Sequence, residues 1–183
     1  MPEIIVVANQ KGGVGKTTTS INLAAALHKT NYKTLLVDLD SQGNATSASG
    51  LNRSTESSSV YDVLMGLKNI EECFVTSEHD GFTLLPSNSD LMAAEIEMLS
   101  IKNRESALKE KINSIPREFD YILIDSPPSM NILTLNALAA ANEIIIPVQC
   151  EYYALEGMSG LLESIYKIKE TINPNLQIKG VLR

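Results

Sequence analysis

Short runs of apolar residues alternate along the chain with longer segments whose apolar residues recur every three or four positions. An unbroken apolar run of this length is typical of a strand that is buried on both sides. The runs predict six strands, at residues 3–8, 33–40, 81–87, 120–129 (where the strand leads into a Pro-Pro turn), 143–149 and 177–183.

Most segments between these strands are predicted to be helices, because their apolar residues recur every three or four positions. In the last helix the apolar residues follow one another at intervals of three and four from Leu155 to Ile172, and Pro174 comes after its end. Residues 41–59 are small and polar without a period, which predicts a loop. The expected helices are 16–29, 60–66, 89–115 with a break near 100–104, 131–142 and 154–172.

Strands that alternate with helices predict an α/β fold with a doubly wound, mostly parallel sheet and helices on both faces. The chain has 183 residues, enough for one sizeable domain. We therefore expect a single domain over 1–183, without an internal repeat or a linker.

Composition narrows the classes of function. The net charge is −7, which argues against a broadly basic surface for nucleic acid within these residues. Cys73 and Cys150 form no C-x-x-C pair, so we expect two free thiols in a reducing compartment. The apolar start lacks a basic leader, and no stretch reaches the ~18 apolar residues of a membrane span. These features favour an acidic cytoplasmic protein.

A glycine-rich segment, "ANQKGGVGKTTTS", follows the first expected strand and leads into the first helix. Glycines let consecutive backbone N–H groups converge on an anion, and the helix directs its positive end at the same place. Lys16 is placed to reach β and γ phosphates, and the Thr17 hydroxyl to bind Mg²⁺. The expected nucleotide-binding residues are Gly12, Gly13, Val14, Gly15, Lys16, Thr17 and Thr18.

This loop departs from the usual phosphate-loop pattern G-x-x-x-x-G-K-[ST] in two ways. The first glycine is replaced by Gln10, and a second lysine, Lys11, is added. The result is the deviant form K-G-G-x-G-K-T.

Five stretches together resemble one family. "ANQKGGVGKTTTSINLA", "LLVDLDSQGNATS", "LLPSNSDL", "DYILIDSPPS" and "VQCEYYALEG" occur in this order and span essentially the whole chain. They resemble the ParA (Soj-type) chromosome and plasmid partition ATPases. These belong to the deviant Walker A group of P-loop NTPases, with MinD and the nitrogenase iron protein.

The resemblance implies roles for particular residues. Lys11 would cross an ATP-dependent homodimer interface to the partner's phosphates, as an arginine finger does. Asp40 would orient the attacking water, and Asp125, in the Walker B position, would hold Mg²⁺ through water. Asp38, two residues before Asp40 on the same side of its strand, would assist at the metal. Ser126–Pro128 would form a switch that senses the γ-phosphate.

Simpler explanations exist for the same residues. A lysine on an acidic surface is often merely solvated, and acids often end strands as turn formers. Neither His28 nor His79 has a partner at catalytic spacing. We expect His28 to be packed on the apolar face of its helix, and His79 to lie in a loop.

The chain ends inside an apolar strand pattern, at Arg183, whereas family members continue well beyond this point. We expect the continuation to carry adenine contacts and much of the surface that binds DNA nonspecifically. A fragment without those strands would expose apolar edges and favour an altered or swapped assembly.

The function that the resemblance implies is a slow, Mg²⁺-dependent ATPase that acts as a dimerisation switch in DNA segregation. Its partners would be a ParB-type centromere-binding protein and nonspecific DNA of the nucleoid. The alternatives are a MinD-like division regulator at the membrane, a metabolic ligase on the same scaffold and an iron–sulfur carrier. The ligases lack a lysine at the Lys11 position, and the cysteine spacing does not support a cluster.

Overall fold

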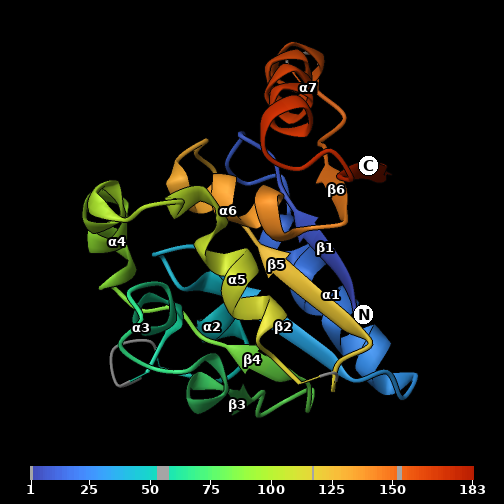
Figure 1. The fold of residues 1–183 in the computed structure, drawn as a ribbon. Coiled ribbons are helices and arrows are strands. Elements are labelled where there is room, and N and C mark those ends of the chain that lie inside the picture. The colour runs from blue at the N-terminus through green and yellow to red at the C-terminus, as the bar shows by residue number, and fades with distance from the viewer. Residues whose placement is uncertain (1, 53–57, 117, 152–153) are drawn as a thin grey trace.

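A seven-stranded sheet forms the centre of the molecule (Figure 1). The computed structural model describes residues 2–52, 58–116, 118–151 and 154–183. The strand order is β3-β4-β2-β5-β1-β6-β7, and only β3 runs antiparallel to its neighbour. The strands are β1 (Glu3–Val7), β2 (Thr34–Asp38), β3 (Val75–Thr76), β4 (Thr83–Leu85), β5 (Tyr121–Asp125), β6 (Glu143–Pro147) and β7 (Gln177–Leu182).

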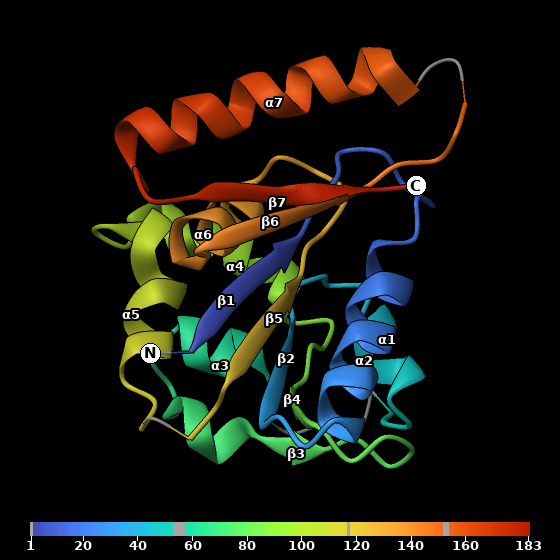
Figure 2. The ribbon, with the colours of Figure 1, turned by 90° about the vertical axis from the view of Figure 1, so that its right-hand side faces the viewer.

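Helices cover both faces of the sheet (Figure 2). One face packs on α1 and α2 through a core that includes Ala24, Leu36 and Leu123, and the other packs on α3 to α7. The helices are α1 (Lys16–Lys29), α2 (Asn44–Ala48), α3 (Val60–Leu64), α4 (Leu91–Glu97), α5 (Ala107–Asn113), α6 (Ile132–Ala140) and α7 (Ala154–Thr171). Three 3₁₀ turns complete the described elements, at Ile70–Cys73, Met98–Ser100 and Arg104–Ser106.

The register of the central strands brings their carboxyl ends to one edge. β5 lies between β1 and β2, and Asp125 is in register with both Val7 and Asp38. Ligands of open α/β sheets bind beyond this edge. The loops that follow β1, β2 and β5 therefore meet at one place.

The expected α/β architecture and all six expected strands are confirmed. The break near 100–104 is also confirmed, because α4 and α5 are separated by 3₁₀ turns. Two features differ from expectation. The short edge strand β3 was not expected, and the expected loop 41–59 contains α2, while residues 53–57 lie outside the described part.

The expectation that His28 is packed on the apolar face of its helix is wrong. The last turn of α1 lies beside the loop that precedes β4, where Lys29 pairs with Asp80 at 3.7 Å. His28 is exposed there, with its Nε2 beside Gly81. His79 does lie in a loop, and both cysteines are free, with Cys73 buried and Cys150 exposed.

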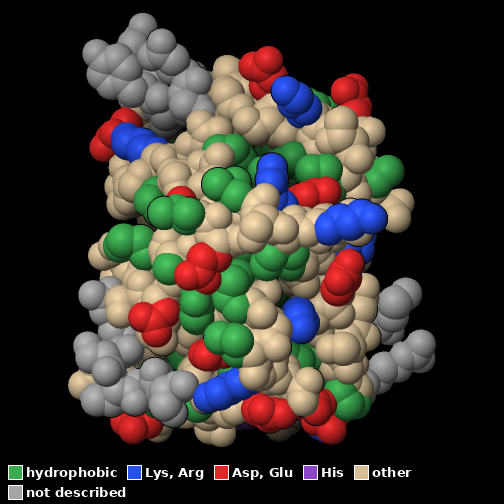
Figure 3. Space-filling model, turned by 60° about the vertical axis from the view of Figure 1, so that its left-hand side comes forward, with side chains coloured by type: hydrophobic (Ala, Val, Ile, Leu, Met, Phe, Trp, Pro, Cys, Tyr) green, Lys and Arg blue, Asp and Glu red, His purple; other side chains and the backbone are tan. Residues whose placement is uncertain are grey.

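The surface carries both charges and scattered apolar side chains. On the face shown in Figure 3, acidic and basic side chains lie interspersed around apolar ones, without a continuous basic patch. Met92, Ile96 and Leu99, on α4 and the following turn, are each more than half exposed. The charge pattern of this face agrees with the acidic balance of the chain.

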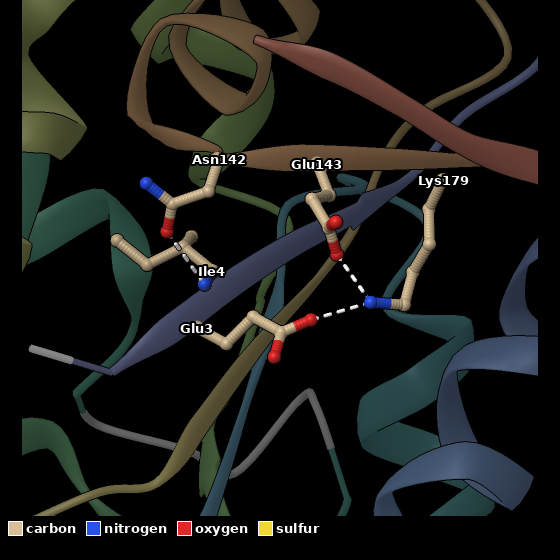
Figure 4. A network of polar contacts seen from close by, with 5 residues as sticks. All are labelled: Glu3, Ile4, Asn142, Glu143 and Lys179. Carbon is tan, nitrogen blue, oxygen red and sulfur yellow. Dashed lines mark hydrogen bonds and ion pairs between the residues drawn. The ribbon is translucent and has the colours of Figure 1, made fainter. Parts of the chain in front are cut away.

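Strand β7 is tied to the sheet by more than its backbone. Lys179 pairs with Glu143 of β6 and, at 2.5 Å, with Glu3 of β1, while Asn142 accepts a hydrogen bond from the Ile4 N–H (Figure 4). Hydrogen bonds to Glu143 and Glu3 raise the pKa of Lys179, and the bond from Lys179 lowers the pKa of Glu3. Such exposed pairs contribute little stability, about 0–1 kcal/mol.

Because the central strands are buried, shortening a side chain on one of them should destabilise the fold. Leu123 on β5 is fully buried, so Leu123→Ala should reduce the free energy of unfolding by about 2–5 kcal/mol through lost burial and a residual cavity. Leu67, which is 64% exposed, provides the matched control, and Leu67→Ala should change it by less than about 0.5 kcal/mol. Urea denaturation measures both, and equal losses would contradict this description of the core.

Candidate nucleotide-binding site

The glycine-rich loop forms an open anion cradle between β1 and α1. Gly13 and Gly15 adopt left-handed conformations, with φ of 73° and 90°. A Cβ atom at Gly12, Gly13 or Gly15 would meet nothing within 4 Å, so these backbone groups face open space. The 14-residue helix α1 begins directly behind the loop, and no described side chain caps its N-terminus. Its first N–H groups are therefore available to an anion.

One side chain within the loop, Asn9, and one that follows β6, Gln149, hold the loop against the end of β6. Asn9 Nδ2 donates to the Pro147 carbonyl at 2.6 Å, and Asn9 Oδ1 accepts from the Lys11 N–H at 3.0 Å. Gln149 Nε2 donates to the Gly13 carbonyl at 2.9 Å. Neither Asn9 nor Gln149 stands out in the sequence, although both directly follow apolar runs, where side chains of a parallel sheet meet.

Lys16 is a buried cation inside the cradle. Its side chain is only slightly exposed, and Nζ donates to the Lys11 carbonyl at 3.1 Å. Burial lowers the pKa of Lys16, and the carboxylates of Asp125 and Asp40 oppose this shift. A phosphate in the cradle would supply the stronger partner that this cation lacks.

Asp125, which acts electrostatically on Lys16, has one carboxylate oxygen without a hydrogen-bond partner among the described residues. Its Oδ1 accepts a hydrogen bond from Ser20 Oγ at 3.0 Å, whereas its buried Oδ2 has no partner among the described residues. Burial raises the pKa of Asp125 to about 6, with Asp40 adding to the rise and the Thr17 and Ser20 hydroxyls counteracting it. A buried, unpartnered carboxylate oxygen fits a hydrated Mg²⁺ ion, which prefers oxygen ligands and retains several waters.

Asp38 and Asp40 have different surroundings. Asp38 is fully buried, and both its oxygens accept hydrogen bonds, Oδ2 from Thr46 and Oδ1 from the Asp40 N–H. Burial, with help from Asp125, raises the pKa of Asp38 to about 7. Asp40 Oδ1 accepts from the Gln42 N–H at 2.9 Å. Asp38 is thus engaged by the protein, in contrast to Asp125.

The remaining expected residues surround the cradle. Lys11 is 41% exposed, and its Nζ pairs with Glu151 Oε2 at 2.6 Å. Val14 is buried, Thr17 is half-buried and Thr18 is exposed. In the expected switch, Ser126 is buried and its Oγ donates to the Val7 carbonyl at 2.9 Å.

A cavity of about 530 Å³ adjoins the loop, lined in part by Val14, Thr19, Gln149 and Cys150. Its size and position suit a nucleoside whose phosphates lie in the cradle. A cavity of about 560 Å³ lies at the opposite end of the strands, near Pro2 and Phe119. That second cavity is remote from Lys16 and Asp125, so we assign the site to the first.

Known proteins with similar sequences agree with this geometry. The AAA domain family matches residues 2–178. The chromosome partitioning protein ParA of Myxococcus xanthus is 47% identical over 179 residues, which are 98% of this chain and 63% of that protein. The sporulation initiation inhibitor protein Soj of Bacillus subtilis is 44% identical over 182 residues, which are 100% of this chain and 72% of Soj.

The chain belongs to the ParA/Soj family of partition ATPases. One solved structure similar to this ParA/Soj chain is that of cobyrinic acid a,c-diamide synthase from Mycobacterium smegmatis, with a bound ATP analogue and magnesium. It has a TM-score of 0.96 and 41% identity, over 100% of this chain and 74% of that chain. The described helices of the ParA/Soj chain include none with the length and apolar character to cross a bilayer.

The raised pKa of Asp125 predicts how the stability of this ParA/Soj chain depends on pH. Between the unfolded and folded pKa values the folded state binds more protons, so stability falls as pH rises from about 4 to about 6. Asp125→Asn removes this titration. The stability of the variant relative to the wild type should therefore increase over that range, by up to about 3 kcal/mol.

Urea denaturation of the nucleotide-free protein at several pH values measures this difference. Glu110→Gln, at an exposed position on α5, provides the control and should follow the wild-type curve. Parallel curves for Asp125→Asn and wild type would show that burial does not perturb Asp125.

Proposed function

We propose that the chain binds ATP with Mg²⁺ at the glycine cradle and hydrolyses it slowly to ADP and phosphate. The observation that carries this proposal is the pairing of the open cradle at the start of α1 with the unpartnered Asp125 Oδ2 behind it. An anion site and a metal-ligand oxygen within one cluster suit a nucleoside triphosphate–metal complex better than either ligand alone.

The residues of the cradle divide the binding between them. The N–H groups from Gly12 to Thr18 and the Lys16 ammonium hold the phosphates, while Thr17, and Asp125 through water, hold Mg²⁺. When bound, Mg²⁺ neutralises charge on the β and γ phosphates. Asp38 has a structural role beside these residues, because both its oxygens already accept hydrogen bonds from the protein.

Asp40 and Lys11 provide the hydrolytic step. Asp40 orients the water that attacks the γ-phosphate, and Lys11 of one subunit stabilises the charge that develops on the partner's ATP. In the single chain Lys11 instead pairs with Glu151. Hydrolysis is therefore slow until a homodimer forms and Lys11 leaves this partner.

The role of this cycle is DNA segregation. The relative from Myxococcus xanthus is named a chromosome partitioning protein. We propose that the ATP-bound dimer of this chain binds nonspecific DNA of the nucleoid in the cytoplasm and that a ParB-type partner stimulates hydrolysis. A net charge of −7 gives this chain little attraction for DNA. We therefore place the DNA contacts largely in the part of the longer relatives that this chain does not match.

A metabolic ligase is the second candidate, because one similar solved structure bears the name of an amide-forming synthase. The exposed cation Lys11 favours the first candidate. A lysine at the rim of the cradle suits action on a neighbouring subunit, whereas a ligase that works within one subunit has no need of it.

Co-sedimentation with DNA tests the proposal, in the presence of ATP, ADP or no nucleotide, on the complete protein with any segment that corresponds to the unmatched part of its relatives. We expect ATP alone to support DNA binding. Lys16→Ala should weaken ATP binding at least about tenfold, because a buried charge-assisted contact is lost. Lys11→Ala should retain ATP binding but lose dimerisation and hydrolysis, and Lys29→Ala, at an exposed lysine of α1, provides the matched control.

Three results would contradict the proposal. Calorimetry that detects no binding of ATP–Mg²⁺ to the folded protein would remove the nucleotide site. Binding to lipid vesicles in place of DNA would favour a membrane-associated regulator. ATP turnover that depends on a small carboxylic acid, and that Lys11→Ala leaves unchanged, would favour the ligase.

A further inference from the structure

A closed ring of buried hydrogen bonds surrounds the backbone of Asp40. Asp38 Oδ2 accepts from the Thr46 N–H at 2.8 Å and from Thr46 Oγ1 at 2.7 Å. Thr46 Oγ1 in turn accepts from the Ser87 N–H at 2.9 Å. The Thr46 hydroxyl proton is thus directed to Asp38, which leaves its lone pairs for Ser87.

Two further bonds close the ring on Asp40 itself. Ser87 Oγ donates to the Asp40 carbonyl at 2.8 Å, and the Asp40 N–H donates to Asp38 Oδ1 at 3.2 Å. Both backbone polar groups of Asp40 are therefore held, one by Ser87 and the other by Asp38.

The ring joins three separate segments at a place that is shielded from solvent. Asp38 ends β2, Thr46 lies in α2 and Ser87 follows β4. Asp38, Thr46 and Ser87 are 0% exposed and Asp40 is 8% exposed. Hydrogen bonds in such surroundings are directional and costly to break, so they hold the segments in one arrangement.

We propose that Asp38, Thr46 and Ser87 are positioning residues that fix the Asp40 carboxylate for its work on the attacking water. The inference rests on the proposed ATPase activity and adds α2 and the loop after β4 to the site. Ser87 belongs to the stretch "LLPSNSDL", which no step of the proposed function uses. A small displacement of a water-orienting group is sufficient to slow a reaction by about two orders of magnitude.

Ser87→Ala is the most direct variant. It removes one hydroxyl, while the Asp40 carbonyl still accepts from the Gly43 N–H at 2.8 Å, so the fold should remain intact. We expect kcat for ATP hydrolysis to fall about tenfold or more, with KM and the dissociation constant for ATP–Mg²⁺ within about twofold of wild type.

Thr46 offers a conservative pair of variants. Thr46→Val removes the hydroxyl that links Asp38 to Ser87 and should lower kcat at least as much as Ser87→Ala. Thr46→Ser keeps that hydroxyl and should restore kcat to within about threefold of wild type. Should Thr46→Val fail to fold, Ser87→Ala and Thr46→Ser decide the question.

Ser49→Ala is the matched control. Ser49 is equally buried just after α2, but its hydroxyl donates to the Ala45 carbonyl at 2.8 Å and lies outside the ring. It should leave kcat unchanged, with thermal denaturation comparing the stability of all variants. An unchanged kcat in Ser87→Ala overturns the inference. So does a loss that Ser49→Ala reproduces, or one accompanied by an equal loss of ATP affinity.

The wild-type measurement separates this inference from the function on which it rests. Hydrolysis by the wild type with normal kcat in Ser87→Ala overturns the inference alone. Absence of hydrolysis by the wild type, under conditions where ATP–Mg²⁺ binds, overturns the proposed ATPase and this inference together.

Discussion

Two carboxyl groups buried side by side impose the main electrostatic constraint on this molecule. Asp38 and Asp125 are in register at the ends of neighbouring strands, and burial together with nearby carboxylates raises both pKa values. Such a pair persists only where the surroundings compensate it. Hydroxyls from Ser20 and Thr46 and the buried ammonium of Lys16 provide that compensation.

Asp38 and Asp125 differ in how many hydrogen bonds their carboxylates accept from the protein. Both oxygens of Asp38 accept hydrogen bonds, from Thr46 of α2 and from the Asp40 N–H, so Asp38 links α2 to the residues that follow β2. Asp125 keeps one buried oxygen without a partner among the described residues. Two aspartates in register on neighbouring strands therefore differ in hydrogen bonding: both oxygens of Asp38 accept bonds from the protein, whereas one oxygen of Asp125 accepts none from the described residues.

Lys16 contacts the phosphate loop and also interacts electrostatically with the carboxylates of Asp125 and Asp40. Its ammonium lies between the loop carbonyl of Lys11 and the carboxylates, while Lys11 itself points outward to Glu151. Lys16 is therefore buried in the site, whereas Lys11 lies at the surface. This division is what a site completed by a second subunit requires, and it is the physical basis of the proposed switch.

Sequence alone determined the α/β class, the six main strands and the phosphate loop, because these depend on local periodicity, glycine freedom and the order of segments. The resemblance of its motifs to one family also indicated Asp40 and Asp125 as site residues, and the alternation of side chains along a strand added Asp38. Only the tertiary structure decided which acid is saturated, that His28 is exposed, and that Thr46 and Ser87 join Asp40. Those outcomes depend on hydrogen bonds between segments distant in the chain, which no local pattern encodes.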